Sequence, residues 1–282
     1  MRAMDRDVFD AVWAAVEPLL PAPPDTHPLG CHRPRVPDEV CFRGILYRLV
    51  TGASWTTTEA QLGWVVSDTT LRARRDDWIQ AGVFDRLADE ALAAYDRIIG
   101  LDLSEVAIDG SQHKAPCGGE GTGPNCTDKG RSGWKWSLAT DTNGIPVGIV
   151  AAAANRNDCK LVAATLDDIA AKGLLAEIDT LHLDRGYDFA FVRDECTERG
   201  LRDVQIPKCR KRKAKGRLKK KPIPLGLRWP VERTNSWLSN FGQLRRNTDR
   251  RIVHRHAQLQ LAIALLLTAK LIDWANRWSP IR

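Results

Sequence analysis

Three acidic side chains of this 282-residue chain, Asp109, Asp184 and Glu232, stand where acids can take part in catalysis. Asp109 and Asp184 each end a predicted strand, and α/β sheets build their sites at the carboxyl ends of strands. Glu232 lies one turn into a helix that opens at Pro230, a residue suited to a first helical turn. We therefore expect the two aspartates to lie side by side and the three acids to act together.

Acids in this arrangement predict a metal centre. Paired carboxylates repel each other unless cations lie between them, and their hard oxygen atoms suit Mg²⁺ or Mn²⁺. Two such ions about 3.5–4 Å apart can activate an attacking oxygen and stabilise the departing oxygen at a phosphodiester. The three acids therefore predict a site for two Mg²⁺ or Mn²⁺ ions and chemistry on phosphodiester bonds.

Each acid also has a purely structural interpretation. Asp109 precedes Gly110, and Asp184 precedes an Arg-Gly pair, which is typical of turns in both places. Glu232 could be an acid favoured by the positive end of a helix dipole. Taken singly, the structural interpretations are favoured, and only the joint arrangement of the three acids favours a metal site.

The seven cysteines give a weaker metal signal. Cys117 and Cys126 flank a Gly-rich loop that holds Asp128, with His113 nearby, but this spacing matches no standard zinc pattern. The sequence holds no C-x-x-C pair. Reduced structural thiols in a reducing compartment are therefore favoured over a zinc site.

The basic charge of the chain is concentrated in its C-terminal part. Residues 205–282 hold 20 Lys and Arg against three acids, a charge of +17, so the net charge of +7 leaves −10 for residues 1–204. Ten of the fourteen residues of the segment 208–221 are basic. Such asymmetry indicates a polyanionic partner, with nucleic acid as the first candidate and a solvated basic loop as the alternative.

Hydrophobic residues make up 43% of the chain, enough for a sizeable core. The longest apolar stretch, residues 259–272, is interrupted by polar residues, and we expect it to be too short and too polar to span a bilayer. The first residues lack the apolar segment of a signal peptide. We therefore expect a cytoplasmic protein with no membrane partner.

The order of the predicted elements indicates an all-helical N-terminal domain followed by a mixed α/β sheet. Apolar spacing predicts helices over residues 5–20, 38–51, 56–62, 68–82 and 83–99, and later over 158–172, 189–200, from 230 onward and over 255–278. Strands are expected over residues 104–109, 134–141, 145–154, 180–184 and 203–207, with an Asn-Gly hairpin between the second and third and a loop over 115–133. This order matches the five-stranded mixed sheet and flanking helices of a ribonuclease H-like core. It predicts a DNA-binding helical domain over residues 1–100 and a catalytic domain over residues 101–282.

The predicted helices over 56–62 and 68–82 resemble a helix-turn-helix. Leu71 and Trp78 are expected to face the core. Three arginines would then project outward, where a recognition helix meets the major groove: Arg72, Arg74 and Arg75. Ordinary helical hairpins show the same pattern, so both interpretations stand.

Three stretches around the acids resemble the motifs of the DDE transposases of bacterial insertion sequences, in the group named after insertion sequence five, with a transposase domain like that of insertion sequence four. AIDGSQHKA carries Asp109, LHLDRGYDF carries Asp184, and RWPVERTNSWLSNFGQLRR carries Arg228 and Glu232 with three residues between them. WTTTEAQLG and SDTTLRARRDDWIQAGVF resemble the helical N-terminal domain of that family. The resemblance covers nearly the whole chain.

The resemblance implies a transposase in which Asp109, Asp184 and Glu232 bind two divalent metal ions. Water would cut the double-stranded DNA at the terminal inverted repeats, and the freed 3′-hydroxyl would attack the target DNA. Because two ends must be joined, we expect a homodimer on DNA, associated with the bacterial nucleoid. The residues expected to bind DNA are Arg72, Arg74, Arg75, Lys208, Arg210, Lys211, Arg212, Lys213, Lys215, Arg228, Arg233, Trp237, Arg245 and Arg246.

The chain departs from the family pattern at two positions. Leu225 stands where tyrosine is usual, and Ser239 stands where a lysine or arginine is usual. Arg245 or Arg246 could replace the basic residue, which is thought to touch DNA near the cut. Trp237, beyond Glu232, could stack on a displaced base or pack in the core.

Two other functions remain open from the sequence. A metal-dependent nuclease or resolvase on the same core would cut DNA without joining it. A catalytically inactive DNA-binding protein would keep the fold and lose the chemistry, although all three acids are present.

Overall fold

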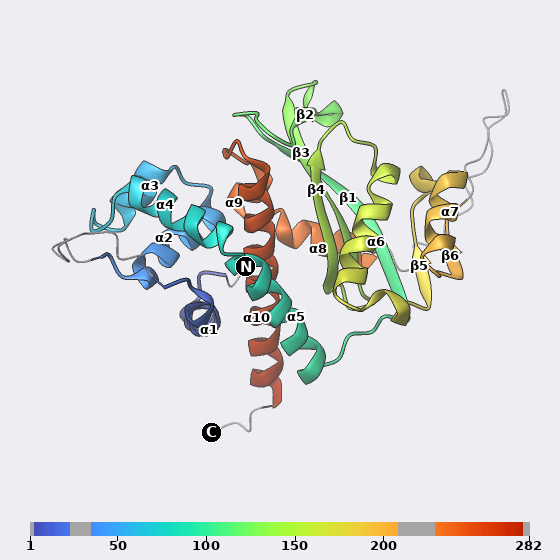
Figure 1. Ribbon diagram of the computed structural model, residues 1–282, viewed down its shortest axis with the longest axis horizontal. Helices are drawn as coiled ribbons and strands as arrows, with labels where there is room; N and C mark the ends of the chain where they lie inside the picture. Colours follow the sequence, from blue (N-terminus) through green and yellow to red (C-terminus); the bar gives the residue numbers. More distant parts are fainter. Residues whose placement is uncertain (1–2, 23–34, 208–228, 279–282) are drawn as a thin grey trace. The chain divides into compact units, whose positions relative to one another are not determined.

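The computed structural model describes residues 3–22, 35–207 and 229–278, which form two compact units (Figure 1). The helical unit takes the described residues of 1–100, 114–120 and 237–282, and the sheet unit takes those of 101–113 and 121–236. One boundary between the two units falls at residue 100. Residues 237–278 belong to the helical unit, so the described residues after 100 are divided between the two units.

The helical unit confirms all five helices expected before residue 100. Its helices are α1 (Arg6–Val16), η1 (Glu17–Leu19), α2 (Asp38–Thr51), α3 (Trp55–Gln61), α4 (Asp68–Gln80), α5 (Val83–Ile98), α9 (Gly242–Arg245) and α10 (Ile252–Trp278). The side chains of Ser54 and Ser67 cap α3 and α4 by accepting hydrogen bonds from the backbone N–H groups of Thr57 and Thr70. These serines therefore explain where α3 and α4 begin.

The C-terminal helix α10 belongs to this unit because its apolar side chains pack against α5 and α1. Leu259, Ala262 and Ala264 are fully buried. By length and composition α10 is also the one helix within the described ranges that could cross a membrane, although the expectation concerned only residues 259–272 of it. The whole helix has 27 residues. Since 56% of its apolar window is buried, as in the core helix of a water-soluble protein, this is weak evidence for a membrane segment.

The sheet is mixed, and it has six strands where five were expected. The strands are β1 (Glu105–Lys114), β2 (Gly123–Pro124), β3 (Ser132–Thr140), β4 (Pro146–Ala153), β5 (Thr180–His182) and β6 (Asp203–Gln205). The order runs β4-β3-β1-β5-β6, with the two-residue strand β2 pairing with β3 inside the expected loop over 115–133. β3 and β4 are antiparallel, whereas β1, β5 and β6 are parallel. This arrangement is consistent with a ribonuclease H-like domain.

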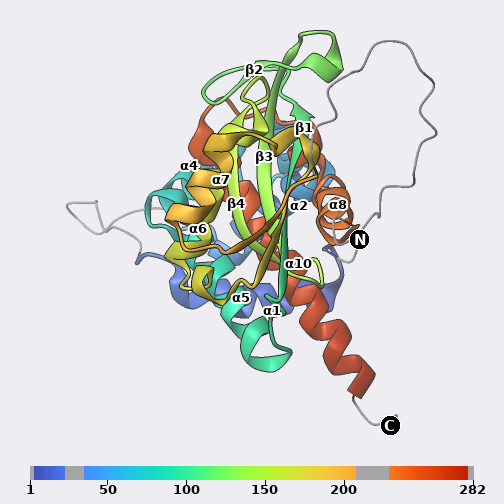
Figure 2. The same cartoon turned by 90° about the vertical axis from the view of Figure 1, so that its right-hand side faces the viewer.

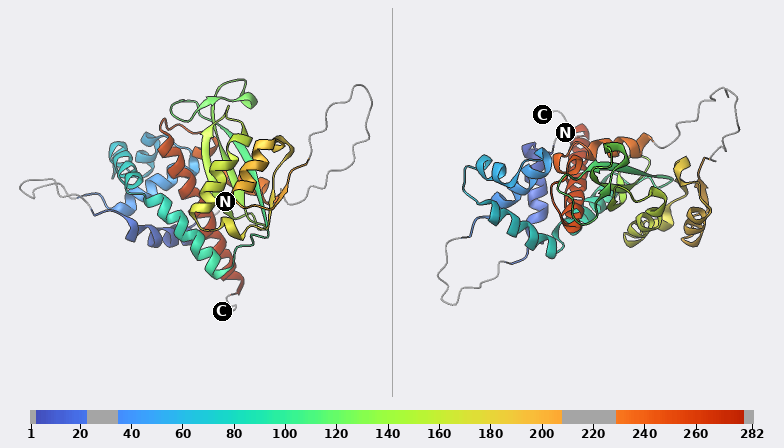
Figure 3. Two further views of the ribbon diagram at one scale, coloured as in Figure 1. Left: turned by 45° about the vertical axis from the view of Figure 1, so that its right-hand side comes forward. Right: turned by 90° about the horizontal axis from the view of Figure 1, so that it is seen from above.

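Helices cover both faces of the sheet. α6 (Val162–Ala171) and α7 (Ala190–Glu198) lie on one face, and α8 (Trp229–Leu238) lies on the other, as Figures 2 and 3 show from different sides. Four short 3₁₀ helices complete the described part of the unit: η2 (Cys126–Asp128), η3 (Asp158–Lys160), η4 (Leu175–Glu177) and η5 (Arg185–Tyr187). The functional residues considered below lie on β1, after β5 and on α8.

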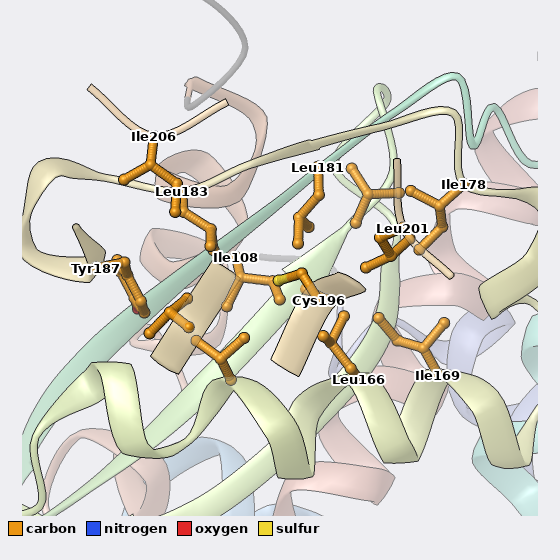
Figure 4. Close-up of a cluster of buried hydrophobic side chains, with 14 of the residues drawn as sticks. Ile108, Leu166, Ile169, Ile178, Leu181, Leu183, Tyr187, Cys196, Leu201 and Ile206 are labelled. Carbon is orange, nitrogen blue, oxygen red and sulfur yellow. The ribbon is translucent and has the colours of Figure 1, made fainter. Parts of the chain in front are cut away.

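The core of the sheet unit lies between the sheet and α6 and α7 (Figure 4). Val106 and Ile108 of β1 contribute to it from the centre of the sheet, together with Leu181 of β5. Leu166 and Ile169 of α6 pack against them. Because side chains alternate along a strand, burial of Val106 and Ile108 on this face assigns Ala107 and Asp109 to the face covered by α8.

Strand β1 does not end at Asp109 as expected, but continues to Lys114. Gly110 is not a turn residue, because it lies within the strand and a Cβ atom there would come within 2.2 Å of Asp158 Oδ1. Asp158 in turn accepts from the buried Lys135 Nζ at 2.7 Å. The glycine therefore allows Asp158 to approach the strand, and the turn interpretation of Asp109 is wrong.

We expect Gly110→Ala to lower the free energy of unfolding by about 1–3 kcal/mol, because the added methyl group overpacks a tight contact. Urea denaturation followed by tryptophan fluorescence measures the loss. In an Asp158→Ala background the same change should cost less, since the clashing carboxylate has been removed. Equal losses of unfolding free energy in the two backgrounds would show that the contact with Asp158 is not the reason why residue 110 is a glycine.

Candidate active site

The parallel pairing of β1 with β5 sets the two aspartates at the same level of the sheet. Glu105 pairs with Thr180, and Ala107 pairs with His182. Continued by two residues, this register brings Asp109 opposite Asp184, which follows the last residue of β5 closely. Both side chains are half-buried. The expectation that the two strands are neighbours is therefore confirmed, although Asp109 lies inside its strand and Asp184 lies two residues beyond the end of β5.

Asp184 combines two roles that the sequence presented as alternatives. Its side chain accepts a hydrogen bond from the backbone N–H of Gly186 and so caps the short helix η5. The cap holds one carboxylate oxygen in a fixed direction. The turn interpretation of Asp184 is thus correct, and it does not exclude a place beside Asp109.

Glu232 reaches this face of the sheet through helix α8. Thr234 Oγ1 donates to the carbonyl oxygen of Gly144 at 2.6 Å, which fixes the helix at the β3–β4 turn. Asn235 Nδ2 lies 3.5 Å from Asp109 Oδ2, a long hydrogen bond. Glu232 is exposed and lies three residues before Asn235 on the same helix. The third acid is therefore carried by the helix that contacts the first.

The three acids do not form a closed ligand cluster. Across residues 3–22, 35–207 and 229–278, no group of three or more His, Cys, Asp and Glu side chains is arranged to hold a metal ion. The same result applies to the possible zinc ligands near Cys126, whose Sγ lies 3.6 Å from Gln112 Oε1. The structure thus has Asp109 on β1, Asp184 just after the neighbouring strand β5 and Glu232 on the covering helix, without joining all three.

His113 of β1 is buried on the same face as Asp109. Its ring stacks on Trp136 of β3, with ring centroids 3.8 Å apart and planes inclined by 15°. Burial lowers the pKa of His113 to about 3, so the imidazole is neutral at physiological pH. His113 is therefore a packing residue here and supplies no positive charge to the site.

The low pKa of His113 predicts that acid destabilises the protein well above pH 3. The unfolded histidine has a pKa near 6.5 and binds a proton that the folded histidine, at about 3, does not bind. Stability from this group is thus lost as pH falls from about 6.5 toward 3, by about 2 kcal/mol between pH 7 and pH 5. Urea denaturation at the two pH values measures the loss. His113→Phe keeps the stacking and should flatten the dependence, whereas an unchanged slope would contradict this assignment.

Two of the arginines expected to bind DNA are buried instead. Arg74 and Arg75 of α4 have only 6% and 7% of their surface exposed. Arg74 pairs with Asp38, and Arg75 Nη1 lies 3.1 Å from Asp249 Oδ1. The expectation that they project outward is wrong because partners distant in sequence draw them inward. Arg72 is exposed, as expected.

The other expected DNA contacts divide into three groups. Arg233 Nη2 donates to the carbonyl oxygen of Asn143. Lys270 Nζ lies 4.2 Å from the centroid of the Trp237 ring. Arg233 and Trp237 therefore both have structural partners. Arg245 and Arg246 are exposed. The remaining expected contacts lie outside the described residues: Lys208, Arg210, Lys211, Arg212, Lys213, Lys215 and Arg228. Leu225 also lies outside them.

Two residues at this site were missed by sequence reasoning. Trp136 Nε1 donates to Asn235 Oδ1 at 2.7 Å, and Asn235 in turn contacts Asp109. The helical spacing of Asn235 from Glu232 was the available signal, since residues three apart share a flank of a helix. Nothing local to Trp136 indicated its partner, which is 99 residues away.

Comparison with known proteins agrees with this architecture. Residues 100–267, more than half of the chain, match the family model described as "Transposase DDE domain", and residues 8–88 match "Putative transposase of IS4/5 family". The chain is 36% identical over 150 residues to the "Putative transposase for insertion sequence element IS402" of Burkholderia cepacia, covering 51% of this chain and 67% of the relative. It is 35% identical over 116 residues to the "Insertion element IS402 uncharacterized 16.2 kDa protein" of the same organism, covering 41% and 78%.

The mixed sheet, with β1 and β5 as parallel neighbours, is consistent with a nuclease-type enzyme domain of the ribonuclease H-like class. The family match over more than half of the sequence is more specific. The chain belongs to the DDE transposases of insertion sequences.

Proposed function

We propose that this chain cleaves DNA at the ends of an insertion sequence and joins those ends to target DNA by a two-metal-ion mechanism. The single observation that carries the proposal is the parallel register of β1 and β5, which pairs Ala107 with His182, two residues before Asp109 and Asp184. Asn235, on the same helix as Glu232, contacts Asp109. Membership of the transposase family, whose substrate is DNA, supports it.

The donor set fits divalent cations that prefer oxygen ligands. Asp109 would contribute to both metal positions, and Asp184 and Glu232 would contribute to one each. Bound Mg²⁺ or Mn²⁺ ions would supply Lewis-acid activation of an attacking oxygen and stabilisation of a departing one. Asn235 and the backbone N–H of Gly186 orient the Asp109 and Asp184 carboxylates before any ion binds.

The proposed reaction has two in-line displacements at phosphorus. Water attacks the phosphodiester at the end of the element, a P–O bond forms as another breaks, and a 3′-hydroxyl leaves. That hydroxyl then attacks a phosphodiester of the target, again exchanging one P–O bond for another. No side chain forms a covalent bond to DNA in this scheme.

The DNA would be held by basic side chains. Exposed candidates in the described part are Arg72, Arg245 and Arg246, and the basic segment 208–221 adds charge near Glu232 in sequence. Two ends have to be joined in one event, so we propose a homodimer on DNA. Its place in the cell would be the bacterial cytoplasm, at the nucleoid.

The test is a strand-transfer assay with a pre-cut, end-containing duplex that carries a free 3′-hydroxyl. With Mg²⁺, the proposal predicts joining to a supercoiled target, and EDTA should abolish it. Cleavage of an uncut end without joining of the pre-cut end would favour a nuclease or resolvase. Binding of the same DNA with neither reaction would favour an inactive DNA-binding protein, and either outcome would overturn the proposal.

A further inference from the structure

A buried amide connects the proposed metal site to the helix that carries Glu232. We infer that Asn235, oriented by Trp136, is a positioning residue that fixes the rotation of the Asp109 carboxylate and the placement of α8. This inference rests on the proposed function, since it assigns a role toward the same metal site.

Trp136 determines which way the Asn235 amide faces. An indole N–H can only donate, so the atom that it meets at 2.7 Å must be the amide oxygen of Asn235. Trp136 is fully buried and Asn235 is 7% exposed, so water does not compete easily for this bond. The amide nitrogen then faces the opposite side, where it lies 3.5 Å from Asp109 Oδ2.

This polarity suits a carboxylate that must remain ionised to bind a cation. An amide N–H donates to the charged form of Asp109 and restricts rotation of the carboxyl group about its side-chain bond. A rotated amide would turn its oxygen toward Asp109 and leave the indole N–H of Trp136 without its acceptor. The pair Trp136–Asn235 therefore selects one carboxylate orientation.

The same amide belongs to a three-residue anchor of α8. Arg233 and Thr234 donate to the carbonyl oxygens of Asn143 and Gly144 in the β3–β4 turn, and Asn235 follows them directly. A Cβ atom on Gly144 would come within 2.9 Å of Thr234 Oγ1, so the close approach of turn and helix depends on that glycine. The anchor joins α8 to β3, its turn and β1.

Helix geometry transmits this placement to Glu232. Three residues along an α-helix correspond to a separation of about 60° around the axis and about 4.5 Å along it. Glu232 thus lies on the flank of α8 nearest to Asn235, toward the start of the helix. A movement of α8 that breaks the contact of Asn235 with Asp109 would displace Glu232 as well.

The experiment measures Mn²⁺ affinity of the full chain without DNA, from the rise in Tm with Mn²⁺ concentration. We expect Asn235→Ala to weaken apparent Mn²⁺ affinity about 10–100-fold, the range typical of residues that orient metal ligands. Trp136→Phe, which removes only the orienting N–H, should weaken it less. Because Trp136 acts through Asn235, adding Trp136→Phe to Asn235→Ala should cause no further loss.

Controls separate positioning from general damage. Asn240→Ala makes the same change at an exposed position and should leave Mn²⁺ affinity at the wild-type value. Circular dichroism checks that each variant is folded, and Trp136→Phe provides a second variant should Asn235→Ala fail to fold. Wild-type affinity in folded Asn235→Ala, or independent and additive losses from the two changes, would overturn the inference.

The two proposals fail in different ways. If the Asp109→Asn variant is folded and binds Mn²⁺ as tightly as the wild type, the metal site itself is wrong and the proposed function fails. If Asp109→Asn abolishes binding while Asn235→Ala leaves it intact, only the positioning role of Asn235 fails.

Discussion

Asp184→Asn is expected to reduce Mg²⁺-dependent cleavage of end-containing DNA by about 10³-fold or more, because a metal ligand contributes several kcal/mol of charge stabilisation in the transition state. The substitution preserves size, and the amide oxygen can still accept from the backbone N–H of Gly186, so η5 should keep its cap. Single-turnover cleavage with enzyme in excess over DNA measures the chemical step directly.

A matched control is Asp194→Asn, which makes the same change at an exposed position of α7. This variant should cleave at the wild-type rate, and both variants should keep the wild-type Tm within a few degrees. Cleavage by Asp184→Asn at the wild-type rate would count directly against a metal-binding role for this aspartate.

Asp249→Ala is expected to destabilise the helical unit by about 3–5 kcal/mol, the loss typical of breaking a buried ion pair. Asp249 accepts from Arg48 Nη1 at 2.9 Å, from Arg75 Nη1 at 3.1 Å and from Gln258 Nε2 at 2.6 Å. Both guanidinium groups are buried, so removal of the carboxylate takes away the acid that they share and leaves Arg75 with Asp76 and Arg48 with the Thr248 hydroxyl. Urea denaturation at pH 7 measures the effect.

The charge state of Asp249 sets the conditions of that measurement. Burial alone would raise the pKa of Asp249, but the guanidinium groups of Arg48 and Arg75 outweigh it and hold the pKa below its usual value. Its contribution to stability is therefore present above about pH 4 and is lost only as pH falls below that value.

Asp10→Ala, which breaks the exposed pair with Arg6, should cost less than about 1 kcal/mol. Similar losses from the two substitutions would contradict the central role of Asp249.

Local patterns were sufficient for most of the secondary structure. The spacing of apolar residues in α2 and α5 is a local signal, and the helices follow it closely. The Asn-Gly pair likewise predicted the turn between β3 and β4, where Gly144 adopts a φ of +76°. Such features depend on neighbours in sequence, which is why they could be read from it.

Several of the differences involve partners distant in sequence. Arg74 and Arg75 looked like groove-reading side chains until Asp38 and Asp249 proved to bind them. Gly110 looked like a turn residue, because the carboxylate of Asp158 that requires it is 48 positions further along the chain. The membership of α10 in the helical unit similarly depends on packing against α5 and α1. None of these contacts leaves a periodic trace in the sequence.

The candidate site was predictable in part. The acids themselves were identified from their positions near the ends of predicted elements, and the β1–β5 register agrees with the predicted adjacency of Asp109 and Asp184. The amide of Asn235 was not foreseen, because its function depends on a hydrogen bond from Trp136 on another strand. Sequence therefore indicated the charged candidates more readily than the neutral side chains beside them.

The most direct test of the central claim is a crystal structure of the full chain with end-containing DNA and Mn²⁺, using anomalous scattering to locate the ions. We expect two manganese peaks beside the scissile phosphate, both contacted by Asp109, with Asp184 on one ion and Glu232 on the other. A structure with manganese and DNA bound, in which the Glu232 carboxylate contacts neither ion, would contradict it.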